Sequence, residues 1–201
     1  MKNIYDVYIV GLGGQGVLTI GDLLAHAALA RGMEVNFYPT KGMSQRGGFV
    51  QGQLRIGREN VGASLPPKGA DLIVAMERSE ALKGIRYIKQ GTDFLLYDEV
   101  WPTNAMLMGK ESYPEMNDVV KRIKGACAKL TILSDESLPE VDGQRVRANM
   151  FILGAALKST GLKELFSFED ASTALKEFFT KGLEANLAAL KAGYEAQTAA
   201  L

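Results

Sequence analysis

The sequence is poor in the residues that bind metal ions or form covalent cross-links. Its 201 residues include one cysteine, one histidine and one tryptophan. A single cysteine excludes an internal disulfide, a zinc site made of thiolates and an iron–sulfur cluster held by this chain alone. A single histidine excludes a histidine metal cluster or a pair of catalytic histidines. The sequence therefore predicts no metal site held by this chain alone, and it favours a reducing compartment.

The sequence also lacks net charge and long apolar runs. Its 23 Lys and Arg residues balance 23 Asp and Glu residues, and the basic residues are dispersed along the chain. This balance gives no footprint for nucleic acid. No apolar run approaches the roughly 18 residues of a membrane-spanning helix, and no basic start with an apolar stretch resembles a signal peptide. We expect a cytoplasmic protein that binds neither nucleic acid nor a membrane.

Glycine, by contrast, is abundant and unevenly placed. The chain has 22 glycines, where average usage of about 7% predicts roughly 14. Thirteen of them fall within the first 69 residues. Because the excess is confined to one region, we expect the chemistry of the protein to lie there.

Apolar periodicity predicts strands separated by helices. Strand-like segments occupy residues 4–10, 34–38, 49–56, 71–76, 93–97 and 129–133. Helical spacing runs from Val17 to Gly32, in a short stretch before residue 93, and from Glu115 to Lys124. The alternation in segment 49–56 indicates an exposed or antiparallel strand. Together these segments predict an α/β fold, with a Rossmann-like, mostly parallel sheet flanked by helices.

From Ala148 onward the pattern is helical only. Apolar residues recur at helical spacing after Ala148, from Phe168 to Leu175, and from Leu175 to Tyr194. This C-terminal helical segment, about 148–201, is expected to pack on the sheet or on a partner. We find neither an internal repeat nor a long linker, so a single domain over residues 1–201 is preferred to a boundary near residues 141–145.

The first glycine cluster lies between a predicted strand and a predicted helix. It reads G-x-G-x-x-G and comprises Gly11, Gly13, Gly14, Gln15 and Gly16. Such glycines allow a tight turn, and free N–H groups at a helix start favour an anion. The acidic residue that would bind a dinucleotide ribose is missing, because the second strand ends in Phe-Tyr-Pro-Thr at residues 37–40. Anion binding and simple close packing of strand on helix both remain open.

The second glycine cluster lies in a loop between two predicted strands. Its members are Gly42, Met43, Gln45, Arg46, Gly47 and Gly48. Arginine offers a two-pronged donor, and the glycines leave backbone N–H groups accessible, so the loop suits a carboxylate or phosphate. The alternative is a tight turn with a solvated arginine.

The two clusters together resemble a known family. The segments are GLGGQGV at 11–17, GMSQRGGFVQGQLRIG at 42–57, ADLIVAMERSEAL at 70–82 and ANMFILGAAL at 148–157. They are similar to the small subunit of 2-oxoacid:ferredoxin oxidoreductases. The resemblance is strongest to the beta subunit of the indolepyruvate enzyme, which corresponds to the gamma subunit of the pyruvate and 2-oxoglutarate enzymes.

The resemblance implies a subunit without cofactors of its own, inactive alone. The complex is expected to oxidise a 2-oxoacid to an acyl-CoA and to pass electrons to ferredoxin. It would use thiamine diphosphate, Mg²⁺, [4Fe–4S] clusters and coenzyme A, held mainly by a large subunit that is this chain's partner. The residues carried over as cofactor-binding or subunit-interface loops are both glycine clusters and Asn149. The alternatives are a self-sufficient Rossmann-type nucleotide-dependent oxidoreductase and a non-enzymatic ligand-binding module.

Four further polar residues are weighed individually. Glu77 follows a predicted buried strand, at the edge where α/β sheets bind ligands, so a functional role and a solvated position are equally open. Asp98 and Glu99 also follow a strand and are interpreted as loop charges. Asn149 precedes an apolar helical run, and N-capping would be a sufficient reason for it.

Three rare residues receive plainer interpretations. We expect His26 to have a structural role and Cys127 to be a buried, inert thiol. Trp101 could equally anchor a partner or fill the core.

Overall fold

The computed structural model describes residues 4–42, 47–59, 61–102, 104–126, 129–134 and 138–196. Met43, Gln45, Arg46 and Cys127, which the sequence singled out, lie outside the described residues.

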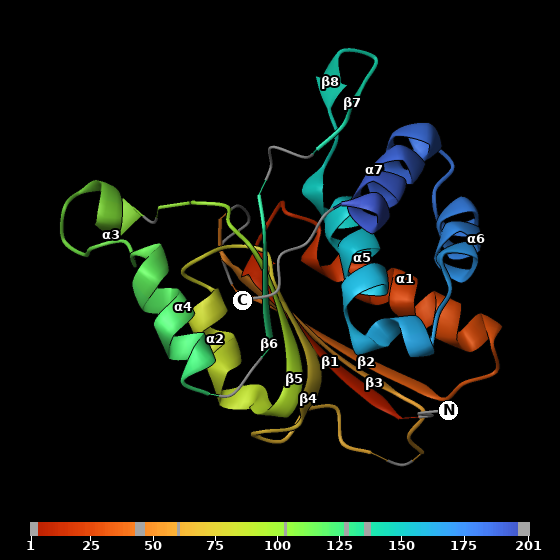
Figure 1. Ribbon diagram of the computed structural model, residues 1–201, viewed down its shortest axis with the longest axis horizontal. Helices are drawn as coiled ribbons and strands as arrows, with labels where there is room; N and C mark the ends of the chain where they lie inside the picture. Colours follow the sequence, from red (N-terminus) through yellow and green to blue (C-terminus); the bar gives the residue numbers. More distant parts are fainter. Residues whose placement is uncertain are drawn as a thin grey trace.

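Strands and helices alternate along the first two thirds of the chain, and helices dominate the last third (Figure 1). The strands are β1 (Tyr5–Leu12), β2 (Val35–Lys41), β3 (Phe49–Ile56), β4 (Ala70–Ala75), β5 (Ile88–Tyr97), β6 (Lys129–Leu133), β7 (Glu140–Val141) and β8 (Gln144–Arg145). The α-helices are α1 (Val17–Ala30), α2 (Ala81–Gly84), α3 (Asn104–Leu107), α4 (Met116–Lys124), α5 (Ala148–Ser159), α6 (Phe168–Phe178) and α7 (Leu183–Glu195). Two 3-10 turns, η1 (Ile85–Tyr87) and η3 (Gly161–Glu164), complete the described elements.

Six strands form one sheet in the order β2-β3-β1-β4-β5-β6. The pairs β1·β4, β4·β5 and β5·β6 are parallel, whereas β3 is antiparallel to both of its neighbours. Only β3 therefore runs against the others, which confirms the expected mostly parallel sheet. The alternating segment 49–56 is the antiparallel strand, and it is largely buried rather than exposed.

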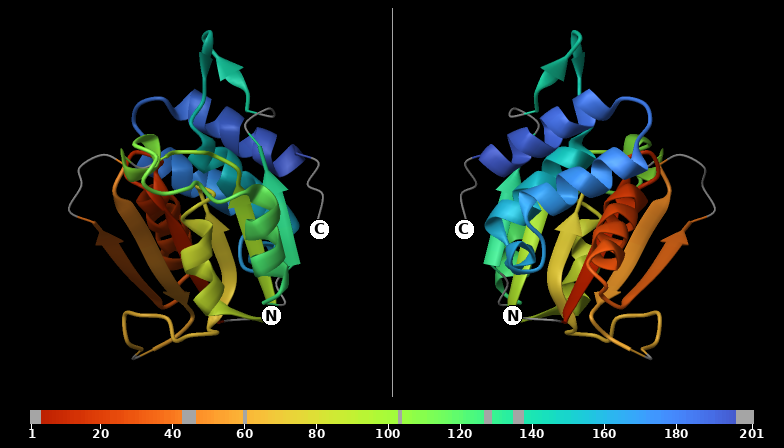
Figure 2. Two further views of the ribbon diagram at one scale, coloured as in Figure 1. Left: turned by 90° about the vertical axis from the view of Figure 1, so that its left-hand side faces the viewer. Right: turned by 90° about the vertical axis from the view of Figure 1, so that its right-hand side faces the viewer.

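Helices cover both faces of the sheet (Figure 2). All eight residues of β1 are buried, as an uninterrupted apolar strand predicts. Val7 and Ile9 belong to the core beneath α1, α5, α6 and α7, whereas Tyr8 and Val10 belong to the core beneath α2 and α4. Successive side chains of one strand thus fill two separate cores.

The C-terminal helical segment packs on the sheet. The buried residues of α5 run without a break from Asn149 to Leu157 and join the same core as β1. A helix that is apolar all round is expected where it is enclosed on all sides. Here α7 and the sheet enclose it, so α5 is part of the core of the fold.

Several boundaries differ from the sequence prediction. The second strand continues to Lys41, beyond the predicted segment 34–38, and includes Pro39. β2 is an edge strand, where a missing N–H donor is tolerated. Strand β5 begins at Ile88, earlier than expected. The helical run after residue 168 is divided between α6 and α7. The small hairpin β7–β8, which projects from the body in Figure 1, had no clear signal in the sequence.

The order of the strands reverses at β1, because the strands that follow it in the sequence lie on both sides of it in the sheet. From β1 it passes through α1 to β2 and β3 on one side, and β4 to β6 lie on the other side. Open α/β sheets bind ligands in the crevice outside the carboxyl ends of strands at such a switch point. The segments that follow β1 and β4 therefore form the expected place for a site.

Candidate functional site at the carboxyl edge of the sheet

The two glycine clusters meet at the carboxyl edge. The Gly13 N–H donates a hydrogen bond of 2.8 Å to the Gly48 carbonyl, and the Gly47 N–H donates one of 3.3 Å back to the Gly13 carbonyl. The Gly42 N–H donates to the Phe49 carbonyl at 2.7 Å and closes the connection between β2 and β3. Two segments that are distant in the sequence, at Gly13 and at Gly47–Gly48, thus form one continuous backbone surface.

The starts of α1 and α5 lie against each other beside this surface. Gly16 is the N-cap of α1 with φ of 82°, and a Cβ there would collide with the side-chain amide of Asn149. Asn149 is 5% exposed and is the second residue of α5. The expectation that Asn149 caps its helix is wrong, because the N-cap is Arg147. Asn149 instead packs one helix start against the other.

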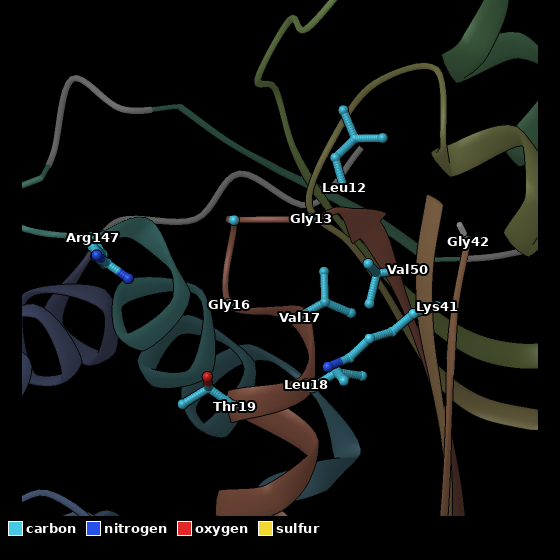
Figure 3. Close-up of a pocket in the computed structure, with 11 residues that line it drawn as sticks. Leu12, Gly13, Gly16, Val17, Leu18, Thr19, Lys41, Gly42, Val50 and Arg147 are labelled. Atoms are coloured by element: carbon cyan, nitrogen blue, oxygen red, sulfur yellow. The ribbon is translucent and has the colours of Figure 1, made fainter. Parts of the chain in front are cut away.

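A cavity of about 460 Å³ opens between these elements (Figure 3). Its lining comes from the first glycine turn, the first residues of α1, the end of β2, the start of β3 and Arg147. In Figure 3 the Lys41 side chain reaches from the end of β2 toward the start of α1. Gly13, Gly14, Gly16 and Gly42 line this cavity, so it brings the two predicted loops together.

The charge at this cavity is positive. Within the part of the chain that the structure describes, the Arg147 side chain has no hydrogen-bond or ion-pair partner. Partial burial raises the pKa of Asp22, and the positive charge of Lys41 opposes that rise. Neither Gly16 nor Arg147 caps its helix through a side chain. Two helix starts without a side-chain cap, together with two cations, suit a carboxylate or phosphate.

Gln15 ties together the ends of three strands. Its side-chain Oε1 accepts a 2.7 Å hydrogen bond from the Leu12 N–H at the end of β1. Its Nε2 donates to the Met76 carbonyl after β4 at 2.8 Å and to Glu99 Oε2 after β5 at 2.7 Å. The spacing of the cluster singled out Gln15, but it could not show that its amide is fully used within the chain. Gln15 positions the glycine turn over the switch point.

Glu77 is completely buried, which overturns the solvated interpretation. Its carboxylate accepts hydrogen bonds from Ser79 Oγ at 2.6 Å, from the Glu80 N–H at 2.8 Å and from the Trp101 N–H at 3.3 Å. The Tyr113 hydroxyl is a fourth donor. Burial and the bond to Glu77 raise the pKa of Tyr113, so its phenol stays protonated and remains a donor. Through Trp101 and Tyr113, Glu77 therefore anchors the segment between β5 and α4.

Asp98 and Glu99 are bound residues rather than loop charges. Asp98 accepts two hydrogen bonds from the Arg78 guanidinium, at 2.7 and 3.0 Å, and the first of these is the largest contribution that raises the pKa of Arg78. Glu99 accepts from Gln15 through its side chain and from the Arg78 N–H through its carbonyl. The sequence could not show these partners, because they come from different strands.

The two remaining aromatic and imidazole side chains lie nearer the surface. Trp101 is 44% exposed, and its indole nitrogen would stand 3.5 Å from a Cβ at Gly47, so it borders the second glycine cluster. His26 lies on α1, far from this edge. Its Nε2 is 2.6 Å from Glu177 Oε2 on α6. The contact joins two exposed helix faces, which agrees with a structural role.

The metal-binding side chains of the described residues are not grouped as the metal-dependent cofactors of the complex would require. Among the described residues, no group of three or more His, Cys, Asp or Glu side chains is placed to hold a metal ion. The one cysteine of the sequence cannot ligate a cluster. No described helix is long and apolar enough to cross a membrane.

The fold and the site define a doubly wound α/β domain that presents a glycine-rich, cationic surface at its switch point. Residues 6–196 match the family described as pyruvate ferredoxin/flavodoxin oxidoreductase, and the chain belongs to this family. The resemblance to the small, gamma-type subunit of 2-oxoacid:ferredoxin oxidoreductases is confirmed. The chain is a subunit of such an oxidoreductase complex.

Individual relatives agree with this assignment. The chain is 30% identical to the indolepyruvate oxidoreductase subunit IorB of Archaeoglobus fulgidus, over 94% of this chain and 93% of the relative. Its fold matches the pyruvate oxidoreductase subunit PORC of Thermotoga maritima with a TM-score of 0.71, at 21% identity and 99% coverage of both chains. It also matches a chain of 2-oxoglutarate:ferredoxin oxidoreductase from Magnetococcus marinus with a TM-score of 0.60 at 20% identity, covering 96% of this chain but 31% of that one.

Proposed function

We propose that this chain is the small subunit of an enzyme that oxidatively decarboxylates an aryl 2-oxoacid, with indolepyruvate as the leading candidate. The product would be an acyl-CoA, and the electrons would pass to ferredoxin. The substrate class is supported by the relative from Archaeoglobus fulgidus, whose name specifies indolepyruvate. The observation that carries the subunit's role is the joined pair of glycine clusters beside Lys41 and Arg147, a surface suited to holding an anion.

The partner we propose is a larger subunit that holds thiamine diphosphate, Mg²⁺ and the [4Fe–4S] clusters. A chain that contains a similar fold as less than a third of its length supports this arrangement, because there the domain is covalently joined to others. Exposed apolar side chains also gather in the excursion between β5 and α4, at Val100, Leu107 and Met108. Exposed apolar patches are typical of protein interfaces.

Within this complex, the second glycine cluster is expected to face the active site of the large subunit. Gln45 and Arg46 would contribute to an anion-binding or subunit-contact surface, without transferring a proton themselves. The backbone bonds from Gly47 and Gly48 to Gly13 support this placement, because they tie the ends of that loop to the cavity.

Reconstitution with the large subunit tests the proposal. That subunit is to be sought in the neighbouring open reading frame by its thiamine-diphosphate and ferredoxin-type cysteine motifs. The two chains together should reduce ferredoxin with indolepyruvate and coenzyme A, and neither chain should do so alone. Arg46→Ala should weaken assembly or raise the KM for the oxoacid or coenzyme A, whereas Arg122→Ala, on the exposed face of α4, should change neither. Unchanged assembly and kinetics in Arg46→Ala would refute the role of this loop.

The same preparation separates the alternatives. In a dinucleotide enzyme, an acidic residue at the end of the second strand binds the ribose. In this sheet β3 lies between β1 and β2, so the end of β2 is about 5 Å, one strand spacing, farther from the glycine turn. A self-sufficient dinucleotide enzyme would nevertheless show micromolar binding of NAD(H) or NADP(H) in isothermal titration. A non-enzymatic module would stay monomeric and would not co-purify with a large, iron-containing subunit.

A further inference from the structure

A second cavity, of about 380 Å³, lies at the switch point itself. It is bordered by Gly14 and Gln15 after β1, by Met76 after β4, and by Tyr97 and Trp101 at and beyond the end of β5. Leu138, Val146 and Arg147 close it from the side of the hairpin and α5. Cavities of roughly 300 to 1,000 Å³ with apolar walls and a few polar groups are typical of small-molecule sites.

The walls of this cavity are mostly apolar and aromatic. Met76 and Tyr97 are buried, at 1% and 4% exposure, and form its floor at the ends of β4 and β5. Trp101, which is 44% exposed, also lines the cavity. Aromatic side chains favour offset or edge contacts with another aromatic ring. The chemistry of this lining therefore suits an aromatic group.

The charged side chains that line the cavity are Glu99, Arg145 and Arg147. The Glu99 carboxylate at its edge is hydrogen-bonded by Gln15. Arg147, which lines both this cavity and the first one, has no side-chain partner among the described residues. A guanidinium binds a carboxylate through two parallel hydrogen bonds. The ligand that completes this cavity is thus an acid with a ring.

We propose that this cavity binds an aromatic monocarboxylate, in the size range from phenylacetate to an indole-bearing 2-oxoacid. Its ring would lie between Trp101 and Met76, and its carboxylate would meet Arg147. The site would give the small subunit its own affinity for acids of the aryl class. Identifying the ligand with a substrate or product of the complex rests on the proposed function, whereas the binding itself rests on the cavity.

The only tryptophan of the chain lines the cavity, so its fluorescence reports binding directly. Titration of the isolated full chain with phenylacetate, which does not emit where indole does, should give a saturable change in emission. We expect a Kd between about 10 µM and 1 mM for a ligand of this size. Phenylacetamide, which lacks the charge, and acetate, which lacks the ring, should each bind at least about tenfold more weakly, a difference of about 1.4 kcal/mol.

Matched variants locate the ligand. Arg147→Gln should raise the Kd for phenylacetate more than about tenfold, and Arg147→Lys should retain part of the affinity. Arg122→Ala should bind as the wild type does. Trp101→Phe, followed by isothermal titration, should keep binding while losing the signal. Circular dichroism establishes that each variant is folded.

Three outcomes would overturn the inference: no saturable change in the wild type, equal binding of phenylacetamide, or unaltered affinity in a folded Arg147→Gln chain. The proposed function is judged separately by the reconstituted complex. If the complex reduces ferredoxin with an aryl 2-oxoacid while the isolated chain does not bind phenylacetate, the cavity proposal fails and the proposed function stands. If the chain binds phenylacetate while the complex does not reduce ferredoxin with an aryl 2-oxoacid, the proposed function fails and the cavity proposal stands.

Discussion

Charged side chains are arranged differently at the amino and carboxyl edges of the sheet. At the amino edge, Asp6 pairs with Arg55 and Arg58, both at 3.1 Å, and Asp71 pairs with Lys89 at 2.9 Å. At the carboxyl edge, the acidic groups Glu77, Asp98 and Glu99 are also hydrogen-bonded, but Arg147, beside two cavities, has no side-chain partner among the residues that the structure describes. The same sheet therefore uses charge for stability at one edge and keeps charge available for a ligand at the other.

The largest expected effect is at the amino edge. Asp6 is 1% exposed, and Asp6→Ala would leave the buried Arg55 guanidinium without its carboxylate. Removing one partner of a buried ion pair costs about 3 to 5 kcal/mol. Urea denaturation should show this loss. Asp6→Ala/Arg55→Met should recover only part of it, because it removes the buried Arg55 guanidinium but leaves Arg58 without its carboxylate.

The same variant tests whether the two edges are independent. If the Asp6→Ala chain remains folded, its affinity for phenylacetate should equal that of the wild type. A parallel loss of binding would show that the charge pairs of the amino edge also shape the cavities, and the contrast between the edges would not hold.

The next effect distinguishes two glycines of the first turn. Both have positive φ, 105° at Gly14 and 82° at Gly16, but a Cβ at Gly14 meets open space, whereas one at Gly16 collides with Asn149. Gly14→Ala should therefore cost only backbone strain, about 1 to 2 kcal/mol of the free energy of unfolding. Gly16→Ala should cost about 2 to 3 kcal/mol, because it adds the collision.

A double variant separates strain from collision. Gly16→Ala/Asn149→Ala removes the side chain that a Cβ would strike. Relative to Asn149→Ala alone, the glycine substitution should then cost about as much as Gly14→Ala does. An unchanged cost would mean that the contact between the starts of α1 and α5 contributes nothing.

The sequence predicted the elements of the fold better than their arrangement. Strand β1 was recognisable because buried parallel strands are apolar throughout, and β3 because its polar and apolar residues alternate. Its position between β1 and β2 was not predicted, since sheet order depends on long-range pairing. The division of the chain as one domain over residues 1–201 stays a prediction.

The candidate site was predicted as two loops, not as one surface. Glycine spacing located both clusters, but their mutual hydrogen bonds join residues that only the sheet brings together. Glu77 was ambiguous because two of its four hydrogen-bond donors, Trp101 and Tyr113, are distant in the sequence. Lys41 and Arg147 were missed as site residues; a cation at the end of a strand and one directly before an apolar helix were the available signals.

At the carboxyl edge, substitution of Tyr113 tests how much the hydrogen bonds of Glu77 contribute to the free energy of unfolding. Tyr113→Phe removes one of the four donors to the buried Glu77 carboxylate. The remaining three limit the cost to about 1 to 2 kcal/mol. Tyr38→Phe, at an exposed position on β2, is the matched control and should leave the urea midpoint unchanged. Equal stability of the two variants would imply that Glu77 does not depend on the Tyr113 hydroxyl.

The smallest effect is expected where α1 reaches the amino edge and Arg31 meets Asp170 at the start of α6. Burial alone would raise the pKa of Asp170, but hydrogen bonds from Ser167 and Arg31 outweigh it, so the pKa lies below its ordinary value. Asp170→Asn should cost about 0.5 to 1 kcal/mol at pH 7 because it weakens the capping box with Ser167. A carboxyl whose pKa is lowered on folding stabilises the fold above its unfolded pKa of about 3.9 and loses that contribution as the pH falls further. The stability difference between wild type and Asp170→Asn should therefore be constant from pH 7 to about 5 and narrow below about 4.

Arg31→Ala should lower the free energy of unfolding less than Asp170→Asn does, since the exposed ion pair is weaker than the cap. A reversal of that order would place the stabilisation in the ion pair instead.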